Sequence, residues 1–541
     1  MVDKLTYVGN LENLALIAKE QKMKLNELFI GKVDAKNEIM EDTIENKDLF
    51  MGSFLLPDNI VLDDFYKRKR YFVLGYKGTG KTALLRYIEK KLIQQRNIQS
   101  IFLLFKTDIS EDEKKRMAHL ARTTLVEQNS NDISEDVSYD DVWMWLIHRL
   151  IVNKIETTNS NLFKHNKDLE RYINCIHASA ENEHESISWI GKFFPSVKRG
   201  KIKAGINAGV INAKFGLDLE WGDSNKESIN FSSLVKKAMN LFLKLSPGSD
   251  ELFIFLDELE LVYSTKKQYI KDIKLIRDLI AVITRMNEIF KSAGFKLAIV
   301  AAIRDEVVVA ISSAGREINK AVDDYGVSLR WQQAGGNLEK HPLIQMISQK
   351  IAASDKTISC DGVWRKYFPQ KINNLPCQEY ILRQTWYRPR DIIRFLGIAQ
   401  KNYPNAERFE QYMFEAIAKD YSSESWVELT EELLSVFSPA DMEALKKILT
   451  GFYSPFSATD FSNRMQQLGS IYEDVALFGQ SKKIGDVLYV LYRVGVIGNT
   501  GKRVRFFCRG DNDFDITKFI KIHDPLWNFL SITRNINLPK V

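Results

Sequence analysis

Apolar runs alternate with helical periodicities from residue 71 to residue 302. Four runs have the length and the flanking residues of buried strands: Tyr71–Leu74, Ile101–Phe105, Leu252–Leu256 and Leu297–Ala302. Apolar positions recur at helical spacing in Thr82–Gln95, after the first run, and in Tyr269–Phe290, between the last two. Strands that alternate with helices are typical of a parallel sheet with helices on both faces. We therefore expect an α/β fold here.

The chain between Lys81 and Asp257 is much longer than a crossover between two strands needs. We expect an insertion at about residues 114–244. Its later part alternates apolar and polar residues near 199–221, around a turn at Gly209–Asn212, which predicts a β-hairpin. The pattern indicates an inserted mixed subdomain of unassigned role.

Helical patterns dominate after Gln332, and the pattern changes again further along the chain. Capped helix starts occur at Ser438 and Ser457, and a third helix is expected at Ile484–Val494. A tight turn at 499–501 then precedes an alternating stretch. Three helices followed by a hairpin predict a C-terminal winged helix-turn-helix.

Length and composition agree with several packed parts. A chain of 541 residues is too long for one hydrophobic core, and 45% apolar residues exclude disorder of the whole chain. The changes of pattern give four parts: an N-terminal segment at 1–70, an α/β core at 71–335, a helical lid-like region at 336–427 and a winged helix-turn-helix domain at 428–541.

The net charge, the cysteine positions and the apolar stretches limit the possible partners and the cellular location of the protein. The net charge of +6 is too small to indicate a nucleic-acid-binding protein by itself. Four scattered cysteines lack metal-ligand spacing and favour reduced thiols: Cys175, Cys360, Cys377 and Cys508. No apolar run resembles a signal peptide or a membrane span. We expect a soluble, cytoplasmic protein without a membrane partner.

A glycine-rich sequence between the first strand and the first helix matches G-x-x-x-x-G-K-[ST]. Its residues are Gly75, Tyr76, Lys77, Gly78, Thr79, Gly80, Lys81 and Thr82. In such a phosphate loop the backbone amides surround the phosphates, the lysine contacts the β- and γ-phosphates, and the hydroxyl ligates Mg²⁺. A glycine-rich structural turn, the alternative, does not account for this position between strand and helix. No guanine-reading N-K-x-D sequence is present, so we expect ATP with Mg²⁺.

Two acidic residues, Asp257 and Glu258, follow the apolar run Leu252–Leu256. Beside a Mg-phosphate site, Asp257 would hold the metal's ligand shell and Glu258 would polarise the attacking water. Two acids after a strand can also cap a helix, and Glu260 is a second candidate for the base. Together with the phosphate loop, the pair predicts an ATPase.

These motifs resemble the P-loop ATPases that place a glutamate beside the aspartate of the second motif, including the AAA+ and STAND classes. Ile299–Arg304 looks like their fourth core strand, which implies that Arg304 lies near the γ-phosphate; a solvated strand end is the alternative. Phe29–Glu38 looks like the adenine-side segment of origin-recognition-type and STAND ATPases, with Lys32 where an arginine is usual.

The segment Trp386–Leu396 resembles the R-P-R-D segment of a poorly characterised family of bacterial P-loop ATPases, where it precedes a winged helix. Pro389 would fix the start of a helix, and the arginines on either side can face a phosphate. We assign Arg388 to nucleotide binding and Arg390 to catalysis. An ion pair of either arginine with Asp391 is the alternative.

A basic cluster, Lys502, Arg503 and Arg505, follows the turn at 499–501 and would suit DNA phosphates. The preceding helix, Ile484–Val494, is apolar around most of its circumference, whereas a helix that reads bases exposes Arg, Asn or Gln. DNA and a protein are therefore equal candidates for the partner of the winged helix.

The motifs together predict an ATP-driven molecular switch with Lys81, Glu258, Arg304 and Arg390 as catalytic residues. The resemblance to bacterial ATPases implies a role in phage defence or in DNA transactions. The alternative is a STAND-like signalling scaffold that binds ATP tightly and forms homo-oligomers on a trigger. A small-molecule kinase is disfavoured because Glu258 suits the activation of water.

Overall fold

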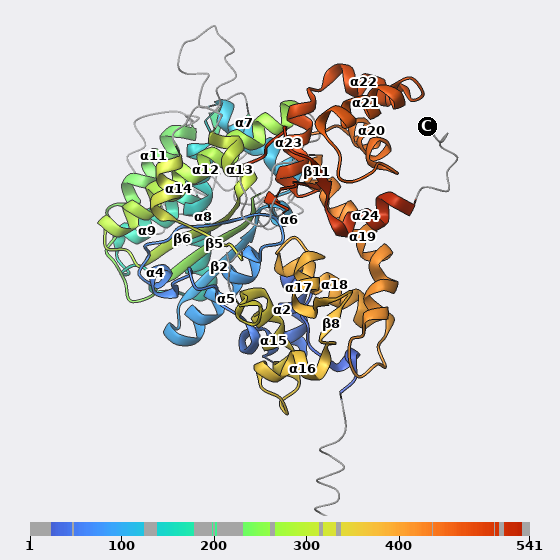
Figure 1. Ribbon diagram of the computed structural model, residues 1–541. Coiled ribbons are helices and arrows are strands. Elements are labelled where there is room, and N and C mark those ends of the chain that lie inside the picture. Colours follow the sequence, from blue (N-terminus) through green and yellow to red (C-terminus); the bar gives the residue numbers. More distant parts are fainter. Residues whose placement is uncertain are drawn as a thin grey trace, which may run out of the picture. The chain divides into compact units, whose positions relative to one another are not determined.

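The computed structural model (Figure 1) describes residues 23–45, 48–123, 138–177, 197–198, 201–202, 231–259, 266–312, 318–331, 337–434, 436–501, 504–507 and 513–532. The chain forms two compact units. The sheet unit comprises residues 58–77 and 81–329. The helical unit comprises residues 1–57, 78–80 and 330–541.

The sheet unit is built on five parallel strands in the order β2-β5-β6-β1-β7. Their bounds are β1 Phe72–Gly75, β2 Gln99–Leu104, β5 Leu252–Leu259, β6 Leu297–Arg304 and β7 Gly326–Ser328. The α/β fold is confirmed, and all four predicted apolar runs are strands of this sheet. The sequence pattern misses β7 because its three residues are only half-buried and too few to show an alternation.

Helices cover both faces of the sheet. On one face α12 (Lys266–Ser292) shares a buried apolar cluster with alternate strand residues such as Ile254 and Ile299. The intervening residues, such as Phe253, are also buried but lie outside that cluster. α5 (Lys81–Arg96) packs on β1, β2, β5 and β6 through buried leucines and isoleucine that the cluster does not include. Burial on both sides explains why these strands are continuously apolar.

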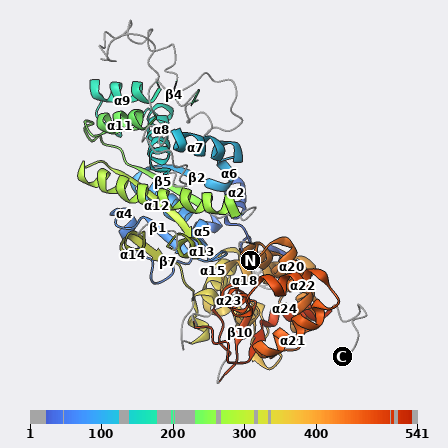
Figure 2. The same cartoon turned by 90° about the horizontal axis from the view of Figure 1, so that it is seen from above.

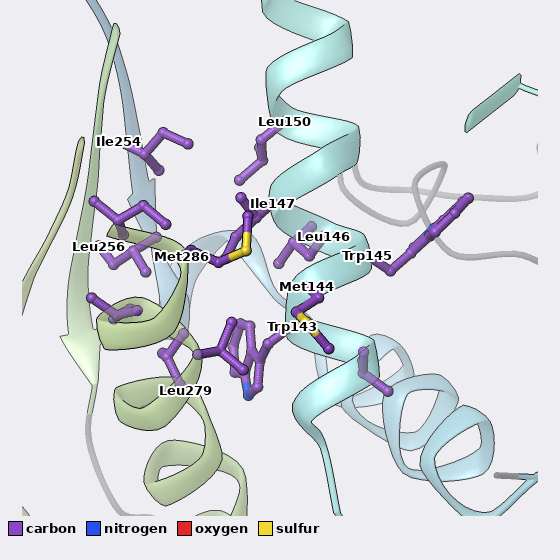
Figure 3. Close-up of a cluster of buried hydrophobic side chains, with 14 of the residues drawn as sticks. Trp143, Met144, Trp145, Leu146, Ile147, Leu150, Ile254, Leu256, Leu279 and Met286 are labelled. Carbon is purple, nitrogen blue, oxygen red and sulfur yellow. The ribbon is translucent and has the colours of Figure 1, made fainter. Parts of the chain in front are cut away.

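The insertion contributes four described helices: α7 Glu111–Thr123, α8 Asp140–Thr158, α9 Lys167–His177 and α11 Phe231–Phe242. α8, α9 and α11 pack on one another (Figure 2). Side chains of α8 point in several directions: Leu150 lies near Ile254 of β5, whereas Trp145 points away from the sheet (Figure 3) and packs on Phe231. The insertion's helices are therefore part of the core of the sheet unit.

The predicted hairpin near 199–221 is described only at its beginning. β3 (Val197–Lys198) pairs antiparallel with β4 (Lys201–Ile202). The expected turn at Gly209–Asn212 lies outside the described residues.

The helical unit begins with η1 Leu25–Glu27, α2 Ala35–Glu45 and α3 Leu49–Ser53. Its middle part consists of η3 Leu338–Lys340, α15 Pro342–Ser354, η4 Cys360–Gly362, α16 Val363–Tyr367, β8 Lys371–Ile372, β9 Leu375–Pro376, α17 Cys377–Arg383, α18 Pro389–Asn402 and α19 Gln411–Leu433. The helical character expected after Gln332 is therefore present. α19 runs through residues 427 and 428, where the sequence pattern puts a domain boundary.

The C-terminal module, residues 436–532, contains α20 Pro439–Leu449, α21 Ala458–Gly469, α22 Glu473–Ser481, α23 Ile484–Val494, β10 Ile497–Asn499, β11 Ile520–Ile522 and α24 Asp524–Ile532. Capping boxes start α20 at Ser438 and α21 at Ser457, as predicted. The expectation of three helices before the hairpin is wrong. α22 lies between the second and third, and its nine residues are too short for a clear helical period.

The expected hairpin after α23 is described in part. Asn499 and Arg505 form one bridge with reciprocal backbone hydrogen bonds of 2.8 Å, whereas β10 pairs antiparallel with β11. Lys502 and Arg503 lie outside the described residues. The winged helix thus stays a prediction. Among the described helices, none has the length and apolar character needed to cross a membrane.

Candidate nucleotide-binding site

The phosphate loop joins β1 to α5, and two glycines in its middle have left-handed backbone angles. Gly78 has φ of +80° and Gly80 has φ of +93°, a region in which an L side chain is strained. A Cβ atom on Gly78 would also lie 3.3 Å from Cβ of Arg390. The backbone conformation therefore favours glycine at position 78, and the close approach of Arg390 leaves little room for a side chain there.

The side chain of Lys81 turns back onto its own loop. Its Nζ donates hydrogen bonds to the carbonyl oxygens of Gly75, at 2.8 Å, and Tyr76, at 2.9 Å. Burial lowers the pKa of Lys81 to about 8, and the Glu306 carboxylate opposes this shift. Two neutral carbonyls hold the ammonium, and a phosphate would give it a charged acceptor.

Asp257 lies in β5, the strand next to β6 in the sheet, and its side chain is buried. Burial raises the pKa of its carboxyl group, while a hydrogen bond from Thr82 opposes the shift. Oδ1 accepts a hydrogen bond of 2.8 Å from the backbone N–H of Glu258, and Oδ2 accepts none from the described residues. A buried carboxylate oxygen beside a hydroxyl suits Mg²⁺, which takes oxygen ligands.

The described residues contain no group of three or more His, Cys, Asp or Glu that could enclose a metal ion. Mg²⁺ commonly binds through one or two protein oxygens, water and phosphate rather than through a full protein cage. Thr82 and Asp257 are the residues that fit this arrangement.

Glu258 has φ of +60°, an uncommon conformation for a residue other than glycine and one that clusters at functional sites. The register of β5 against β6 shifts between Leu256 and Leu259 around it. The Thr107 hydroxyl, in α6 (Phe105–Asp108) just after β2, donates a hydrogen bond of 2.8 Å to Glu258 Oε2. Sequence reasoning misses Thr107, although β2 neighbours β5 and ends opposite Asp257. The rival base, Glu260, lies outside the described residues.

Arg304 ends β6, the strand between β1 and β5. The sheet register sets it beside Gly75, at the start of the phosphate loop. Its side chain is 18% exposed and its Nη1 lies 3.5 Å from Oε1 of Glu306. The mostly buried guanidinium is not a solvated strand end. Glu306, which sequence reasoning also misses, faces two cations of the site because its charge also acts on Lys81.

The structure places Arg388 and Arg390 at the start of α18, with Pro389 at the first helical position as predicted. Each arginine pairs with a glutamate of α19. Arg388 Nη1 lies 2.9 Å from Glu432 Oε1, and Arg390 Nη1 lies 2.7 Å from Glu428 Oε1.

Asp391 is itself buried, and burial raises its pKa while Arg388 opposes the shift. Its Oδ2 accepts a hydrogen bond of 3.3 Å from the backbone N–H of Trp386, and its Oδ1 lies 3.6 Å from Arg394 Nη1. Asp391 therefore closes the turn that leads into α18.

Residues 78–80, in the middle of the phosphate loop, belong to the helical unit. The Arg390 N–H donates to the Gly78 carbonyl at 3.4 Å, and Trp331 Nε1 donates to the Thr79 carbonyl at 2.8 Å. These contacts fix the middle of the loop through its backbone.

The segment Phe29–Glu38 is anchored within the helical unit by a buried ion pair. Lys350 Nζ of α15 lies 2.6 Å from Glu38 Oε1, and Glu38 Oε2 accepts a hydrogen bond of 2.9 Å from the backbone N–H of Lys32. Gly31, at φ +91°, lies so close that a Cβ atom would come within 2.8 Å of Glu38. The pair fixes the segment; its expected role at the adenine stays a prediction.

Comparison with known proteins identifies one region of the chain. Residues 341–430, from the start of α15 into α19, match the FunZ-associated C-terminal helical domain. This region contains both arginines of the R-P-R-D segment. No curated protein matches the chain.

Among solved structures, the chain aligns with the crystal structure of Cdc6p from Pyrobaculum aerophilum at 10% sequence identity and a TM-score of 0.29. The alignment covers 88% of this chain and 94% of that chain. A TM-score this low does not establish a shared architecture.

Proposed function

We propose that this protein is an ATP-binding and ATP-hydrolysing molecular switch that passes its nucleotide state to the C-terminal module. One observation carries the proposal. The ends of the neighbouring strands β1, β6 and β5 bring the phosphate loop, Arg304 and the pair Asp257–Glu258 to one edge of the sheet unit. This edge, at the carboxyl ends of parallel strands, is where α/β proteins bind ligands.

In this proposal Thr82 and Asp257 would hold Mg²⁺. The bound ion supplies positive charge that stabilises the phosphate oxygens during transfer. The raised pKa of Asp257 would then fall, because a dication beside the carboxylate favours its charged form. Lys81 would exchange its two carbonyl acceptors for phosphate oxygens.

Glu258 is the proposed general base for the attacking water. The hydrogen bond from Thr107 orients its carboxylate and draws electron density from it, so Thr107 is a positioning residue. Arg304 and Arg390 are proposed to stabilise charge on the γ-phosphate, and Arg388 to support nucleotide binding. The packing of Arg390 against Gly78 supports this assignment.

A second candidate is a STAND-like scaffold that holds ATP tightly and oligomerises when triggered. Two features favour it. Glu258 is already engaged by Thr107, and both arginines at the start of α18 form ion pairs with glutamates of α19, although Arg390 shares its glutamate, Glu428, with Arg394. Such a site would bind nucleotide and turn it over slowly until a trigger releases these groups.

The target of the C-terminal module is DNA or a protein. Arg505 and the basic residues before it favour DNA phosphates. The outer face of α23 favours a protein instead, because it exposes Asp486 and Tyr489, at 43%, where a base-reading helix would expose Arg, Asn or Gln.

One experiment separates these candidates. Phosphate release from Mg-ATP is measured with no DNA, with single-stranded DNA and with double-stranded DNA, and the mass in solution is determined with ATP and with ADP. Steady turnover that DNA stimulates supports the switch and a DNA target. Retained nucleotide with an ATP-dependent increase in mass supports the scaffold. Failure to bind ATP at all contradicts both.

A further inference from the structure

The segment Trp386–Asp391 contacts the C-terminal module through its first residue. Trp386 is buried, and its Nε1 donates a hydrogen bond of 2.8 Å to the carbonyl of Gly495. Gly495 follows the last residue of α23 and has φ of +87°, so it turns the chain from this helix toward β10. The Trp386 ring also meets the ring of His523 edge to face, with centroids 4.8 Å apart. Trp386 thus contacts the residue at the start of the turn into β10 and the residue that directly follows β11.

The other end of the segment contacts the phosphate loop. The backbone N–H of Arg390 donates to the carbonyl of Gly78, and the Cδ atom of Arg388 lies 3.5 Å from where a Cβ atom on Gly78 would be. Only three residues lie between Trp386, which contacts Gly495, and Arg390, which contacts Gly78.

The segment between these two contacts is stiff. Pro389 has a fixed φ, Tyr387 is held at φ +53°, and the Asp391 carboxylate closes the turn on the backbone of Trp386. A displacement at one end cannot be absorbed by bending in the middle without breaking one of these constraints.

α19 provides a parallel connection. Its glutamates pair with Arg388 and Arg390, and one turn or more earlier its Ser422 Oγ accepts a hydrogen bond of 2.9 Å from the backbone N–H of Phe529 in α24. A change of ion-pair partner at the arginines would therefore act on α19, and α24 packs against this helix.

We propose that the segment Trp386–Asp391 transmits the occupancy of the phosphate loop to the C-terminal end of α23, with Trp386 as the positioning residue. The proposal rests on the proposed function, since it needs ATP at the loop. Coupling between two binding sites is reciprocal. If ATP changes the affinity of the C-terminal module for its partner by some factor, that partner changes the affinity of the protein for ATP by the same factor.

The test compares Trp386→Phe with the matched control Trp426→Phe. Phenylalanine at 386 keeps a ring against His523 and removes the donor to Gly495. Trp426 is a buried tryptophan of α19 that stacks on Phe529, with ring centroids 5.8 Å apart, and phenylalanine keeps that stacking. Amide hydrogen exchange is followed in 484–499 and 518–526, with and without Mg-ATP, together with ATP affinity.

In the wild type, Mg-ATP is expected to change exchange in 484–499 by at least about fivefold, the lower end of usual coupling. Lys81→Ala should abolish this change. Trp386→Phe should lose most of it while its ATP affinity stays within about threefold of the wild type, and Trp426→Phe should retain it.

Two results overturn the proposal: ATP binds and turns over in the wild type without altering exchange in 484–499, or Trp386→Phe responds as the wild type does. Absence of ATP binding in the wild type would instead overturn the proposed function. If Trp386→Phe does not fold, the wild type compared with Lys81→Ala still decides whether the nucleotide state reaches α23.

Discussion

The candidate basic residues of the two units are held in opposite ways. In the sheet unit, Lys81 rests on two neutral carbonyls, and burial lowers its pKa. In the helical unit, Arg388 and Arg390 are each paired directly with a glutamate of α19. A buried ammonium held by carbonyls gains much from an incoming phosphate, whereas a paired arginine must first give up a carboxylate. Lys81 therefore fits binding and Arg390 fits a step that follows binding, whereas Arg388 would have to leave Glu432 before it could support nucleotide binding.

The strongest way to test this difference is Lys81→Ala. We expect ATP affinity to fall by at least about a hundredfold, because the variant deletes a charge-assisted contact to the β- and γ-phosphates. Titration with a fluorescent ATP analogue measures the loss. Unchanged affinity would remove the phosphate loop from the site. Lys91→Ala, at a half-buried lysine further along α5 and outside the motif, is the matched control.

The acid pair should behave in the opposite way from Lys81. Glu258→Gln is expected to keep ATP binding and to lose about 10²- to 10⁴-fold in turnover, because the amide cannot accept a proton from water. Phosphate release in single-turnover and steady-state assays checks this. A wild-type rate would transfer the role of base to another acid, and Glu260→Gln made in parallel would identify or exclude the nearest one.

The arginines are expected to separate binding from turnover. Arg304→Ala or Arg390→Ala should leave ATP affinity within about tenfold and lower turnover by at least about a hundredfold, since these groups act mainly on charge that develops in the transition state. Glu428→Gln removes the carboxylate partner of Arg390 and should not lower turnover. Loss of thermal stability without a change in rate per folded molecule would assign the arginine to a structural ion pair.

The smallest expected effect concerns pH. The pKa of Lys81 is lowered from 10.5 to about 8, and a bound polyphosphate raises it again because it favours the charged form. The complex with ATP therefore binds more protons than the free protein. ATP affinity is expected to fall as pH rises through about 8 and to level off near the ordinary pKa of lysine, 10.5. The slope is about tenfold per pH unit at most. Lys81→Arg stays charged throughout and should lack this slope.

The sequence predicted the parts of the site that local patterns encode. β1, β5 and β6 are continuous apolar runs because both of their faces are buried, and the motif residues follow them directly. The limits of α23 and the caps of α20 and α21 were also predicted, because a cap acts within four residues. β7 and α22 were missed because each is too short to show its period.

The remaining parts depend on contacts between distant positions. Thr107 and Glu258 lie 151 residues apart, and Arg388 and Glu432 lie 44 apart. No single-sequence pattern links such positions, since each side chain alone is an ordinary polar residue. The sequence suggests Asp391, the nearest acid along the chain, as a partner for either arginine, but it cannot reveal the ion pairs with Glu428 and Glu432 of α19.

The burial of α8 limits how far the chain can be shortened. Trp143 Nε1 donates a hydrogen bond of 2.8 Å to the Leu275 carbonyl of α12, and Leu146, Ile147 and Leu150 belong to the same apolar cluster as Ile254 and Leu256 (Figure 3). Removing the insertion would expose these apolar side chains to water and would favour aggregation of the shortened chain. Any minimal version intended for biochemistry has to retain α8 with its flanking helices.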